Sequence, residues 1–384
     1  MVFPSISRKR ILLISSDVMH YRVSVYNYFH RRFRELGFEF QVMTNKLQPQ
    51  SRVPLEFHLR EMPFVFRDYR RAIVEADPAA IILFLYLKDK ITWPLAHWLR
   101  FKKIPFAFWT KGSNWDAKES RWSRMAFNYA NGLSDALILY ADPCVGEINP
   151  RYATKAFVAN NTINFHDFPA VRESKEEIKS EFGIPFEKVV IFIGRMEEGR
   201  GRKRVDHLID IFRRLDRNDI GLILVGSGLS DSLKSQLNPR NTRYLGEVQD
   251  SRNLGISKLC TMADVCAIPG HVGLGLNQAF HFGLPVVTEA GNHPPEIGYL
   301  KPGRNGFMVP EGDLNALQER LLYLLDNDLI RAEFSRHARD DIRASASIEG
   351  MFDGFRNCVD YLTSRRAIAE RGFDEGGLQK LTAK

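Results

Sequence analysis

The sequence predicts an α/β protein with two consecutive units, each of a size that can bind a nucleotide. Short apolar segments alternate with amphipathic helical segments throughout, which is the pattern of a parallel sheet covered by helices. The chain has 384 residues, and a single core seldom grows beyond roughly 250 to 300 residues. The alternation loosens between Phe165 and Phe186 and then resumes, so we expect the two units to be joined there.

Six strands and the helices between them are expected in the first unit. The strands are the short apolar runs Ile11–Ser15, Phe38–Thr44, Ala79–Tyr86, Pro105–Trp109, Ala136–Tyr140 and Ala156–Asn160. A helix is expected over Tyr21–Leu36, because Tyr26, Phe29, Phe33 and Leu36 recur at spacings of three and four and form one apolar face.

The second unit repeats the same alternation. Its expected strands are Val189–Ile193, Gly221–Val225, Thr242–Leu245, Val265–Ile268 and Pro285–Thr288. The predicted division is an N-terminal domain at 1–165, a linker at 166–187, a C-terminal domain at 188–345, and a final helix and tail at 346–384. Helical periodicity continues beyond Ala344, and the polar tail from Ser364 is expected to be frayed.

The charge balance favours anionic partners. There are 54 Lys and Arg residues against 46 Asp and Glu, which gives a net charge of +8 and suits phosphates, an acidic membrane surface or nucleic acid. The basic residues are scattered among acidic ones, and the sequence has no aromatic stacking platform. We therefore expect no nucleic-acid partner.

The cysteine count and the apolar runs suggest a cytoplasmic protein. Four cysteines, at Cys144, Cys260, Cys266 and Cys358, have no zinc or disulfide spacing, so no structural metal is expected. The longest apolar run, Ala79–Leu87, is far shorter than the roughly 20 residues that span a bilayer. Met1–Arg10 has no apolar signal core, so at most we expect the protein to rest on a membrane.

A strand, a glycine and a basic segment follow one another in Ile191–Ile209. Gly194 lets the backbone approach a ligand, and the next helix adds its N-terminal dipole and free N–H groups. With Arg195 and Lys203 nearby, this pattern favours a diphosphate. The alternative is that Arg200, Arg202, Lys203 and Arg204 form a solvated charge run.

Two later segments also carry candidate binding residues. Gly270, Gly273 and Gly275 follow a strand and precede a helix, so their N–H groups can face an anion or sugar hydroxyls, although such a turn can equally be a tight structural bend. Glu296 lies in a Pro-rich loop, where its carboxylate can accept sugar hydroxyls or cap the local turn.

Taken together, these motifs resemble the donor domain of retaining glycosyltransferases of family 4. The segments that carry the resemblance, in order, are G-R at Gly194 and Arg195, K-R-V-D at Lys203–Asp206, L-V-G-S-G-L at Leu224–Leu229, L-G-E-V at Leu245–Val248, A-D-V at Ala263–Val265, A-F-x-x-G-L-P-V-V at Ala279–Val287, and then P-E-I and N-G-F-M-V. More loosely, His20–Val23, Trp93–Leu95 and Ala159–Asn164 are similar to polysaccharide-building members.

The resemblance implies a GT-B fold, in which two Rossmann-like domains face a central cleft and the last helix crosses back onto the first domain. It implies transfer of a sugar from a nucleotide diphosphate sugar to an acceptor hydroxyl with retained configuration. No cofactor and no metal are expected, because Arg195 and Lys203 match the two family cations that neutralise the leaving diphosphate.

The donor side implied by the resemblance has two departures from the family. Seven residues separate Arg195 from Lys203 where the family commonly has four, so Arg200 or Arg202 could replace Lys203. Gly270 and Gln278 occupy the two positions of the family's E-x7-E pair, and Gln278 can bind a ribose hydroxyl only without charge. The donor-binding residues so expected are Gly194, Val248, Gly270, Gly273, Leu274, Gly275, Gln278 and Glu296.

The first half supplies the expected acceptor side. Lys111 stands where many relatives have a histidine near the reacting sugar, and it is expected to act as a donor to phosphate or sugar. His20, Tyr21 and Arg22 follow the first strand and are expected to face the acceptor; the alternative is that Tyr21 lies in the core and Arg22 on a solvated helix face. The basic helix after them, with Arg31, Arg32 and Arg34 beside Phe29 and Phe33, could lie on an anionic membrane or be a packed helix with a solvated basic face.

These features together predict a retaining, metal-independent glycosyltransferase of the hexosyltransferase type. Its expected partners are a nucleotide-sugar donor, a glycan or lipid-linked glycan acceptor of cell-surface polysaccharide synthesis, and an anionic membrane face. The alternative is a sugar-nucleotide or glycan-binding GT-B protein that has lost catalysis, as Gly270 and Gln278 suggest.

Overall fold

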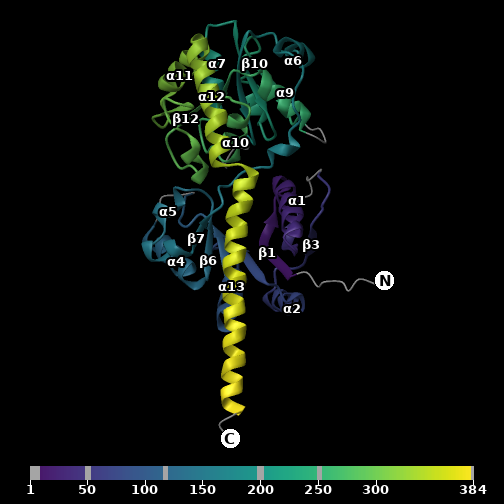
Figure 1. Ribbon diagram of the computed structural model, residues 1–384. Coiled ribbons are helices and arrows are strands. Elements are labelled where there is room, and N and C mark those ends of the chain that lie inside the picture. The colour runs from purple at the N-terminus through teal and green to yellow at the C-terminus, as the bar shows by residue number, and fades with distance from the viewer. Residues whose placement is uncertain (1–8, 48–52, 116–119, 197–202, 249–252, 382–384) are drawn as a thin grey trace, which may run out of the picture. The chain divides into compact units, whose positions relative to one another are not determined.

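The computed structural model describes residues 9–47, 53–115, 120–196, 203–248 and 253–381. They form two compact units, each considered by itself. Unit 1 contains the described residues up to 114, those from 120 to 160 and those from 348 onward, and unit 2 contains Trp115 and the described residues from 161 to 347. Figure 1 shows the elements of both.

Unit 1 is a parallel sheet with covering helices. Its elements are β1 (Lys9–Val18), α1 (His20–Glu35), β2 (Phe38–Leu47), β3 (His58–Glu61), α2 (Phe66–Ala76), β4 (Ala80–Phe84), α3 (Thr92–Phe101), β5 (Phe106–Thr110), α4 (Arg121–Leu133), β6 (Ala136–Leu139), α5 (Cys144–Glu147), η1 (Pro150–Lys155), β7 (Ala156–Val158) and α13 (Ile348–Leu381). The strand order is β3-β2-β1-β4-β5-β6-β7, and all pairs are parallel.

Unit 2 repeats this plan with a six-stranded parallel sheet of order β10-β9-β8-β11-β12-β13. Its elements are η2 (Phe165–Asp167), α6 (Lys175–Glu181), β8 (Lys188–Ile193), α7 (Val205–Arg214), β9 (Ile220–Val225), α8 (Asp231–Lys234), β10 (Thr242–Gly246), α9 (Leu254–Met262), β11 (Val265–Ala267), α10 (Leu274–His281), β12 (Val286–Glu289), η3 (Pro295–Tyr299), β13 (Gly306–Val309), α11 (Leu314–Asp326) and α12 (Asp328–Ser345).

All eleven predicted strands are present, each within a few residues of its expected bounds. Two strands were not expected, β3 and β13. β3 has the polar sequence HLRE at the edge of its sheet, so no apolar pattern marks it. β13 begins at a glycine and is only four residues long. The α/β class with two Rossmann-like units is confirmed.

The predicted helix near the N-terminus is α1, and three of its four predicted apolar residues are in the core. Tyr26, Phe29 and Phe33 are buried, whereas Leu36 follows the last helical residue and is 49% exposed. The rings of Phe29 and Phe33 lie 5.7 and 4.8 Å from the ring of Phe352 on α13. The aromatic face of α1 is therefore covered by protein, which contradicts a membrane role for that face.

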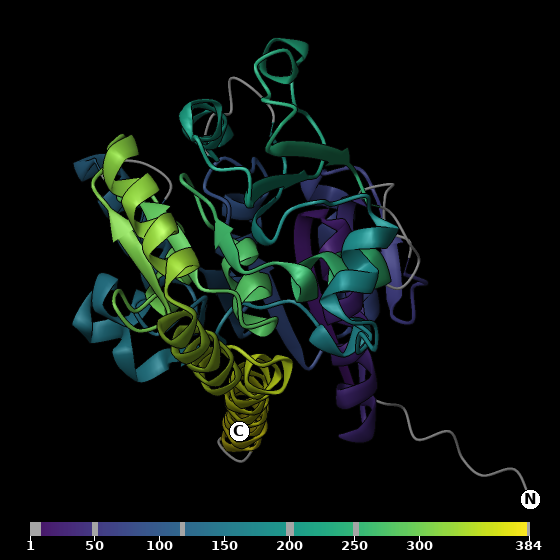
Figure 2. The ribbon, with the colours of Figure 1, turned by 90° about the horizontal axis from the view of Figure 1, so that it is seen from above.

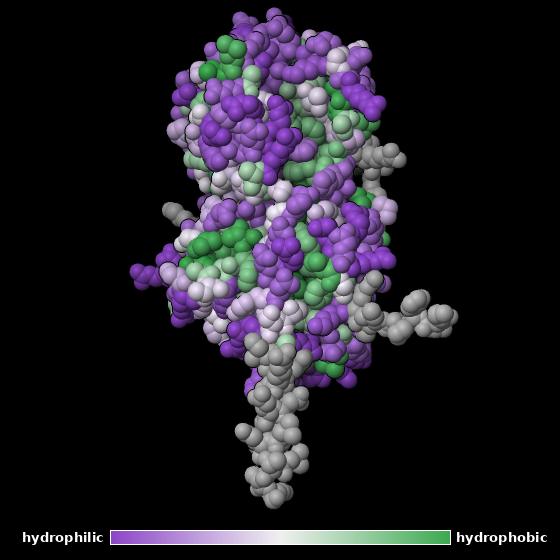
Figure 3. Space-filling view, viewed as in Figure 1, coloured by the Kyte–Doolittle hydropathy of each residue, from purple (hydrophilic) through white to green (hydrophobic). Residues whose placement is uncertain are grey.

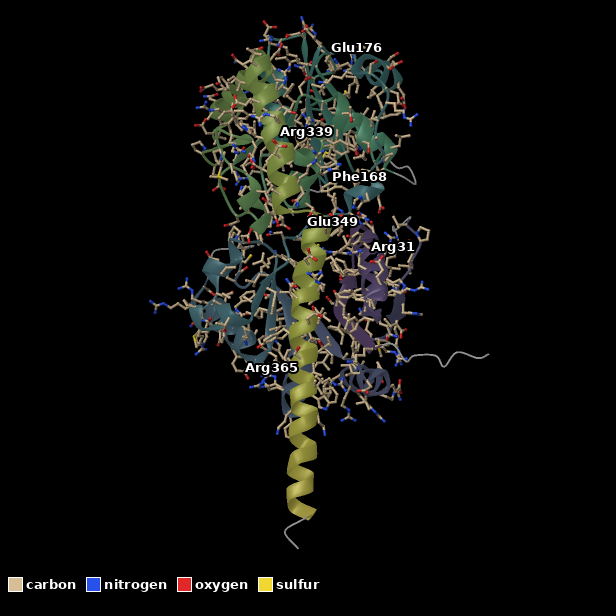
Figure 4. The ribbon with its side chains drawn as sticks, viewed as in Figure 1. Arg31, Phe168, Glu176, Arg339, Glu349 and Arg365 are labelled. Atoms are coloured by element: carbon tan, nitrogen blue, oxygen red, sulfur yellow. The ribbon has the colours of Figure 1, made fainter. Side chains whose placement is uncertain are left out.

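The last helix belongs to unit 1, as the resemblance implies. α13 buries one face, which includes Phe352, Phe355 and Leu362, and presents a hydrophilic face outward (Figure 3). Figure 2 looks down its axis. Arg365, labelled in Figure 4, lies 3.5 Å from Asp135, and Arg366 pairs with Asp77 at 2.6 Å. α13 continues to Leu381, so the tail that the sequence predicts to be frayed from Ser364 is helical as far as that residue.

The segment predicted as a linker, 166–187, is packed into unit 2 instead of connecting two domains loosely. Ser174 and Glu177 form a capping box that starts α6, and Ile178 and Phe186 are buried. Phe186 fits because a Cβ on Gly221 would lie 1.8 Å from its ring. Residues 161–165, assigned to the first domain by the sequence, also belong to unit 2.

The end of α10 shows how helices pack on each other in unit 2. Gly283 ends the turn after α10 with a φ of +74°, and a Cβ there would lie 2.4 Å from a guanidinium nitrogen of Arg339 on α12. Arg339 also donates to the Phe282 carbonyl oxygen at 3.4 Å; Figure 4 labels this arginine and Phe168. Among the described residues, no helix has the length and the apolar character needed to cross a bilayer.

Candidate functional site

The candidate site of unit 2 begins with two glycine turns at the carboxyl edge of its sheet. The Gly194 amide, after β8, donates to the Val225 carbonyl at 3.0 Å, and the Gly226 amide, after β9, donates to the Gly246 carbonyl at 2.8 Å. Gly226 has a φ of +129°, and a Cβ there would lie 2.0 Å from the Gly194 carbonyl oxygen. Only glycine allows these two turns to meet, and they leave bare backbone at the strand ends.

A glycine-containing loop, residues 270–273, follows the next strand of the sheet, β11, and is bonded to Lys203. The Gly270 amide donates to the Lys203 carbonyl at 3.0 Å. In return, the Lys203 ammonium donates to the Val272 carbonyl oxygen at 2.8 Å. A Cβ on Gly194 would lie 3.8 Å from Cε of Lys203, so the basic segment, the first turn and this loop meet at one place.

His293 binds the other backbone group of Val272, its N–H. Its Nε2 lies 2.7 Å from the Glu289 carbonyl oxygen, which can only accept, so Nε2 carries the proton and donates. Its Nδ1 is then free to accept from the Val272 N–H at 3.4 Å. Burial lowers the pKa of His293, which favours this neutral form. The sequence analysis missed His293, although it lies three residues before Glu296.

The helix after this loop starts directly over the end of β8. Gly273 is the N-cap of α10 with a φ of +56°, where a side chain would be strained. A Cβ on Gly275 would lie 3.2 Å from the Ile268 side chain and 3.9 Å from the Ile193 carbonyl oxygen. The first amides of α10 therefore lie close to the Gly194 turn. This proximity is required if Gly194, Gly273 and Gly275 belong to one binding region.

The two cations assigned to the diphosphate have different environments. Burial lowers the pKa of Lys203 to about 8, against an opposing effect of Cys266 and Glu296. Arg195 follows Gly194 directly and is exposed, and within the described parts of the chain its guanidinium has no ion pair. The Lys203 side chain therefore helps to hold the loop in place, whereas the Arg195 guanidinium is available to a ligand.

Arg204 does not belong to a solvated charge run. It pairs with the fully buried carboxylate of Glu289 at 2.9 Å and also with Glu311. Glu289, at the end of β12, accepts in addition from the His207 Nδ1 at 2.6 Å and from the Gly312 amide at 2.8 Å. This network fixes the chain beside Lys203. Arg200 and Arg202, the alternative cations, lie outside the described residues.

Glu296 does not cap the turn in which it lies. It is buried in η3, and one carboxylate oxygen accepts from the amide of Asn161. The side-chain amide of Asn277 on α10 donates to the Asn161 carbonyl at 3.0 Å. The other oxygen of Glu296 is buried without a hydrogen-bond partner among the described residues. That oxygen is an acceptor that a sugar hydroxyl could satisfy.

The structure connects the remaining donor-side candidates less closely to this site. Gln278 lies one turn into α10, and its Nε2 donates to Sγ of Cys260 on α9 at 3.8 Å. Leu274 is the first residue of α10, and Val248 is partly exposed two residues after β10. Their roles toward a ribose or base stay predictions.

The acceptor-side candidates lie at the carboxyl edge of the unit 1 sheet. His20 and Tyr21 begin α1, and the Arg22 guanidinium, 6% exposed, stacks on the ring of Trp109 in β5 at 4.5 Å. Lys111 lies two residues after Trp109 and directly after β5. Because the order β1-β4-β5 places these strand ends together, unit 1 gathers all four residues at one edge.

A small cavity at this edge, lined by both polar and apolar residues, includes a residue that the sequence analysis did not single out, Asp89. Ser15, Ser16 and Thr92 are among the residues that line the cavity. One oxygen of Asp89 is buried without a partner among the described residues. Burial raises the pKa of Asp89, and Ser16 donates to it. Among the described residues, no group of three or more His, Cys, Asp or Glu side chains is placed to hold a metal ion.

Comparison with known proteins matches the second half of the chain to a family. Residues 187–327 match the family model of glycosyl transferases group 1. A phosphatidyl-myo-inositol mannosyltransferase of Mycobacterium leprae is 32% identical over 164 residues, 41% of this chain and 42% of that protein. The matched part spans 42% to 49% of the length of this and two further curated relatives.

Solved structures match nearly the whole chain in fold. Sucrose-phosphate synthase from Thermosynechococcus elongatus has a TM-score of 0.68 at 16% identity, covering 93% of this chain and 100% of that chain. HepE of Anabaena, solved in complex with UDP and glucose, has a TM-score of 0.68 at 15% identity and covers 92% of this chain and 100% of that chain. Both sheets of this chain thus follow the architecture of GT-B glycosyltransferases. Residues 187–327 of the chain therefore match the group 1 glycosyl transferases, and its fold is that of the GT-B glycosyltransferases.

Proposed function

We propose that this protein is a retaining glycosyltransferase that moves a sugar from a nucleotide diphosphate sugar to a hydroxyl of a glycan or lipid-linked glycan in cell-surface polysaccharide synthesis. One observation carries the proposal. The Gly194 turn, the Lys203 ammonium and the first amides of α10 meet at the carboxyl edge of one parallel sheet. Such an arrangement of N–H donors and fixed positive charge suits a diphosphate.

The same groups suit the departure of a sugar. In the reaction, the bond between the anomeric carbon and the terminal phosphate oxygen breaks, and its electron pair stays on the phosphate. Lys203 and Arg195 would stabilise that added charge, which grows in the transition state. The acceptor hydroxyl forms the new bond to the anomeric carbon, and the leaving phosphate takes its proton. These two cations would neutralise the leaving group without a required metal.

Other residues would position the two substrates. The unpartnered oxygen of Glu296 would accept a hydroxyl of the donor sugar. Arg22 and Lys111, at the carboxyl edge of unit 1, would bind the acceptor. The mannosyltransferase name of one relative and the UDP and glucose bound to HepE support sugar-nucleotide chemistry, and the relative's phosphatidylinositol acceptor supports a lipid-linked acceptor.

A second candidate function is sugar-nucleotide or glycan binding without catalysis. Gly270 favours it, because this position offers only its backbone where the family has a glutamate that contacts the sugar. Gln278 also favours it, because its side-chain amide donates to Cys260. A panel of UDP and GDP sugars separates the two functions. Donor hydrolysis or transfer supports the enzyme, and binding with neither supports the second function.

The decisive variant is Arg195→Ala. Because one transition-state donor is removed, transfer should fall by about two orders of magnitude while thermal stability stays unchanged. The matched control is Arg213→Ala, which removes an exposed arginine of α7 that pairs with Asp210. Equal activity of Arg195→Ala and the control would contradict the role of Arg195.

A further inference from the structure

Two helices of unit 1 expose a stripe of large apolar side chains. On α4, Trp122, Met125 and Tyr129 recur at spacings of three and four and are 80%, 61% and 54% exposed. On α3, Phe101 is 80% exposed and lies one turn after His97. We call these four residues and the cations Arg100, Lys102, Lys103, Arg121 and Arg124 the α3–α4 patch.

The two helices lie side by side, so the stripe is continuous. His97 Nε2 lies 2.7 Å from the Tyr129 hydroxyl oxygen, and the rings of Trp93 and Tyr129 are 6.0 Å apart. Tyr129 therefore lies between two turns of α3. Met125 and Trp122 extend the stripe in one direction along α4, and Phe101 extends it in the other along α3. Figure 1 shows α4 at the margin of unit 1 beside β6.

Unusually few residues of α4 are buried. Of its thirteen residues, only Ala130 and Asn131 are buried, and the tryptophan and methionine point outward. A surface helix normally turns its large apolar residues to the core and its polar residues to water. A contiguous exposed apolar surface of this kind marks an interaction site.

The charge around the stripe has one dominant sign. Residues 92–134 contain seven Lys and Arg but only two Asp and Glu, a net +5 within a chain of net +8. Neither α3 nor α4 contains an acidic residue. Arg100 lies 3.4 Å from Asp135, which follows α4, so part of this charge is neutralised. The net positive charge that is left makes the surface complementary to a negatively charged one.

We propose that the α3–α4 patch docks on an anionic lipid bilayer. Tryptophan and tyrosine prefer the headgroup level, where their rings are covered and their polar atoms stay hydrated. Arginine and lysine beside them attract anionic headgroups. A helix with an aromatic apolar face and cationic flanks lies in the interface plane. The proposal goes beyond sugar transfer and does not depend on it.

The location differs from the one that the sequence suggested. The basic residues of α1 flank Phe29 and Phe33, which are fully buried, so α1 can offer only charge. Arg31, labelled in Figure 4, also pairs with Glu56 at 2.8 Å. The α3–α4 patch offers both charge and exposed aromatic area. The α3–α4 patch and α1 can therefore serve as matched test and control surfaces on the same unit.

Vesicle sedimentation of the full chain tests the charge component. The protein should bind vesicles of phosphatidylcholine mixed with phosphatidylglycerol, bind phosphatidylcholine alone much more weakly, and dissociate as salt is raised. Arg121→Ala with Arg124→Ala should weaken binding about 25-fold, since each cation near an anionic surface contributes roughly fivefold. The control, Arg31→Ala with Arg34→Ala, removes the same charge from α1 and should change binding less than about twofold.

Tryptophan fluorescence and an apolar variant test the other component. Trp122 emission should shift to shorter wavelength on mixed vesicles, and this shift should be absent in Trp122→Phe. Trp122→Ala with Met125→Ala should also lose binding at least about tenfold. Its control, Val74→Ala with Leu329→Ala, removes side chains that are 65% and 87% exposed and should bind as the parent does.

Four results would overturn the proposal. The parent protein could fail to bind mixed vesicles. The variants on α4 and their controls could lose binding equally, which would show non-specific charge attraction. The parent could instead form dimers that Trp122→Ala abolishes, or bind an acidic polymer as tightly as lipid, which would assign the patch to another partner.

Discussion

The Lys203 ammonium donates to the carbonyl oxygen of Val272 at 2.8 Å, and this bond ties a partly buried cation to the loop that starts α10. His293 accepts from the backbone N–H of the same residue at 3.4 Å. The loop is thus fixed before any ligand arrives. A preorganised donor set of this kind loses little order when a diphosphate binds, which is what electrostatic stabilisation of a leaving group needs.

The first prediction concerns the pH dependence of nucleotide binding. Because burial lowers the pKa of Lys203 to about 8, the ammonium loses its proton as pH rises through that value. Affinity for UDP or GDP should be constant below about pH 8 and then fall, by up to tenfold for each further pH unit. Titration calorimetry across this range measures the profile.

Two variants separate charge from packing at this position. Lys203→Arg keeps a permanent charge, so the fall above about pH 8 should disappear. Lys203→Met keeps much of the length without charge, so its affinity should be low and independent of pH. An unchanged profile in Lys203→Arg would assign the titration to another group.

The second prediction concerns the contact between two glycine turns. Gly226→Ala would place a methyl group 2.0 Å from the Gly194 carbonyl oxygen, so one turn must move. The substitution should cost about 2 to 4 kcal/mol of unfolding free energy and abolish nucleotide binding. Gly146→Ala is the control, because its methyl group would meet nothing within 4 Å. Normal binding by Gly226→Ala would show that the turn is not part of the site.

The third prediction concerns the buried carboxylate of Glu289. Glu289→Gln removes the buried charged partner that Arg204 and His207 share, so the unfolding free energy should fall by about 2 to 4 kcal/mol. Glu311→Gln removes the other partner of Arg204, which is 58% exposed, and should cost less than about 1 kcal/mol. Urea unfolding at neutral pH compares the two. Equal losses would mean that Glu289 does not anchor the network.

The fourth prediction concerns stability in acid. The His281 ring stacks on Phe165 with centroids 4.1 Å apart, and burial lowers the pKa of His281 to about 4. Between its ordinary pKa near 6.5 and about 4, the unfolded chain binds the proton and the folded chain does not. This group should therefore lower the unfolding free energy by about 2 kcal/mol as pH falls through that window.

Urea midpoints at about pH 7 and about pH 4 test this effect. His281→Phe keeps the stack but cannot take up a proton, so its midpoint should fall less between the two pH values than that of the parent. His58→Phe replaces an exposed histidine in unit 1 and should follow the parent. If His281→Phe also followed the parent, the acid sensitivity would come from elsewhere.

Much of the fold could be predicted because buried parallel strands are continuous apolar runs. β8 and β9 are of this kind, and their bounds agree with the prediction to within one residue. β3 could not be predicted, because an edge strand with the sequence HLRE has no apolar pattern. The region 166–187 was misjudged because its few apolar residues, such as Ile178 and Phe186, are far apart and find partners only in the folded unit.

The residues of the candidate site could be singled out where glycine and charge follow a strand, and less so where partners are distant in sequence. Gly194, Lys203 and the Gly273 bend were identified in this way. The pairing of Arg204 with Glu289 joins residues 85 positions apart, so local sequence shows only a basic run. His293 has no sequence signal beyond its position near Glu296, because its role depends on the Val272 peptide that it contacts.

The most direct test of the central claim is a crystal structure with UDP or GDP bound. The account predicts that the diphosphate lies within hydrogen-bond distance of the Lys203 ammonium and the first amides of α10, with the Arg195 guanidinium on the same phosphates. A nucleotide bound away from both the Gly194 turn and the Gly273 bend would contradict it.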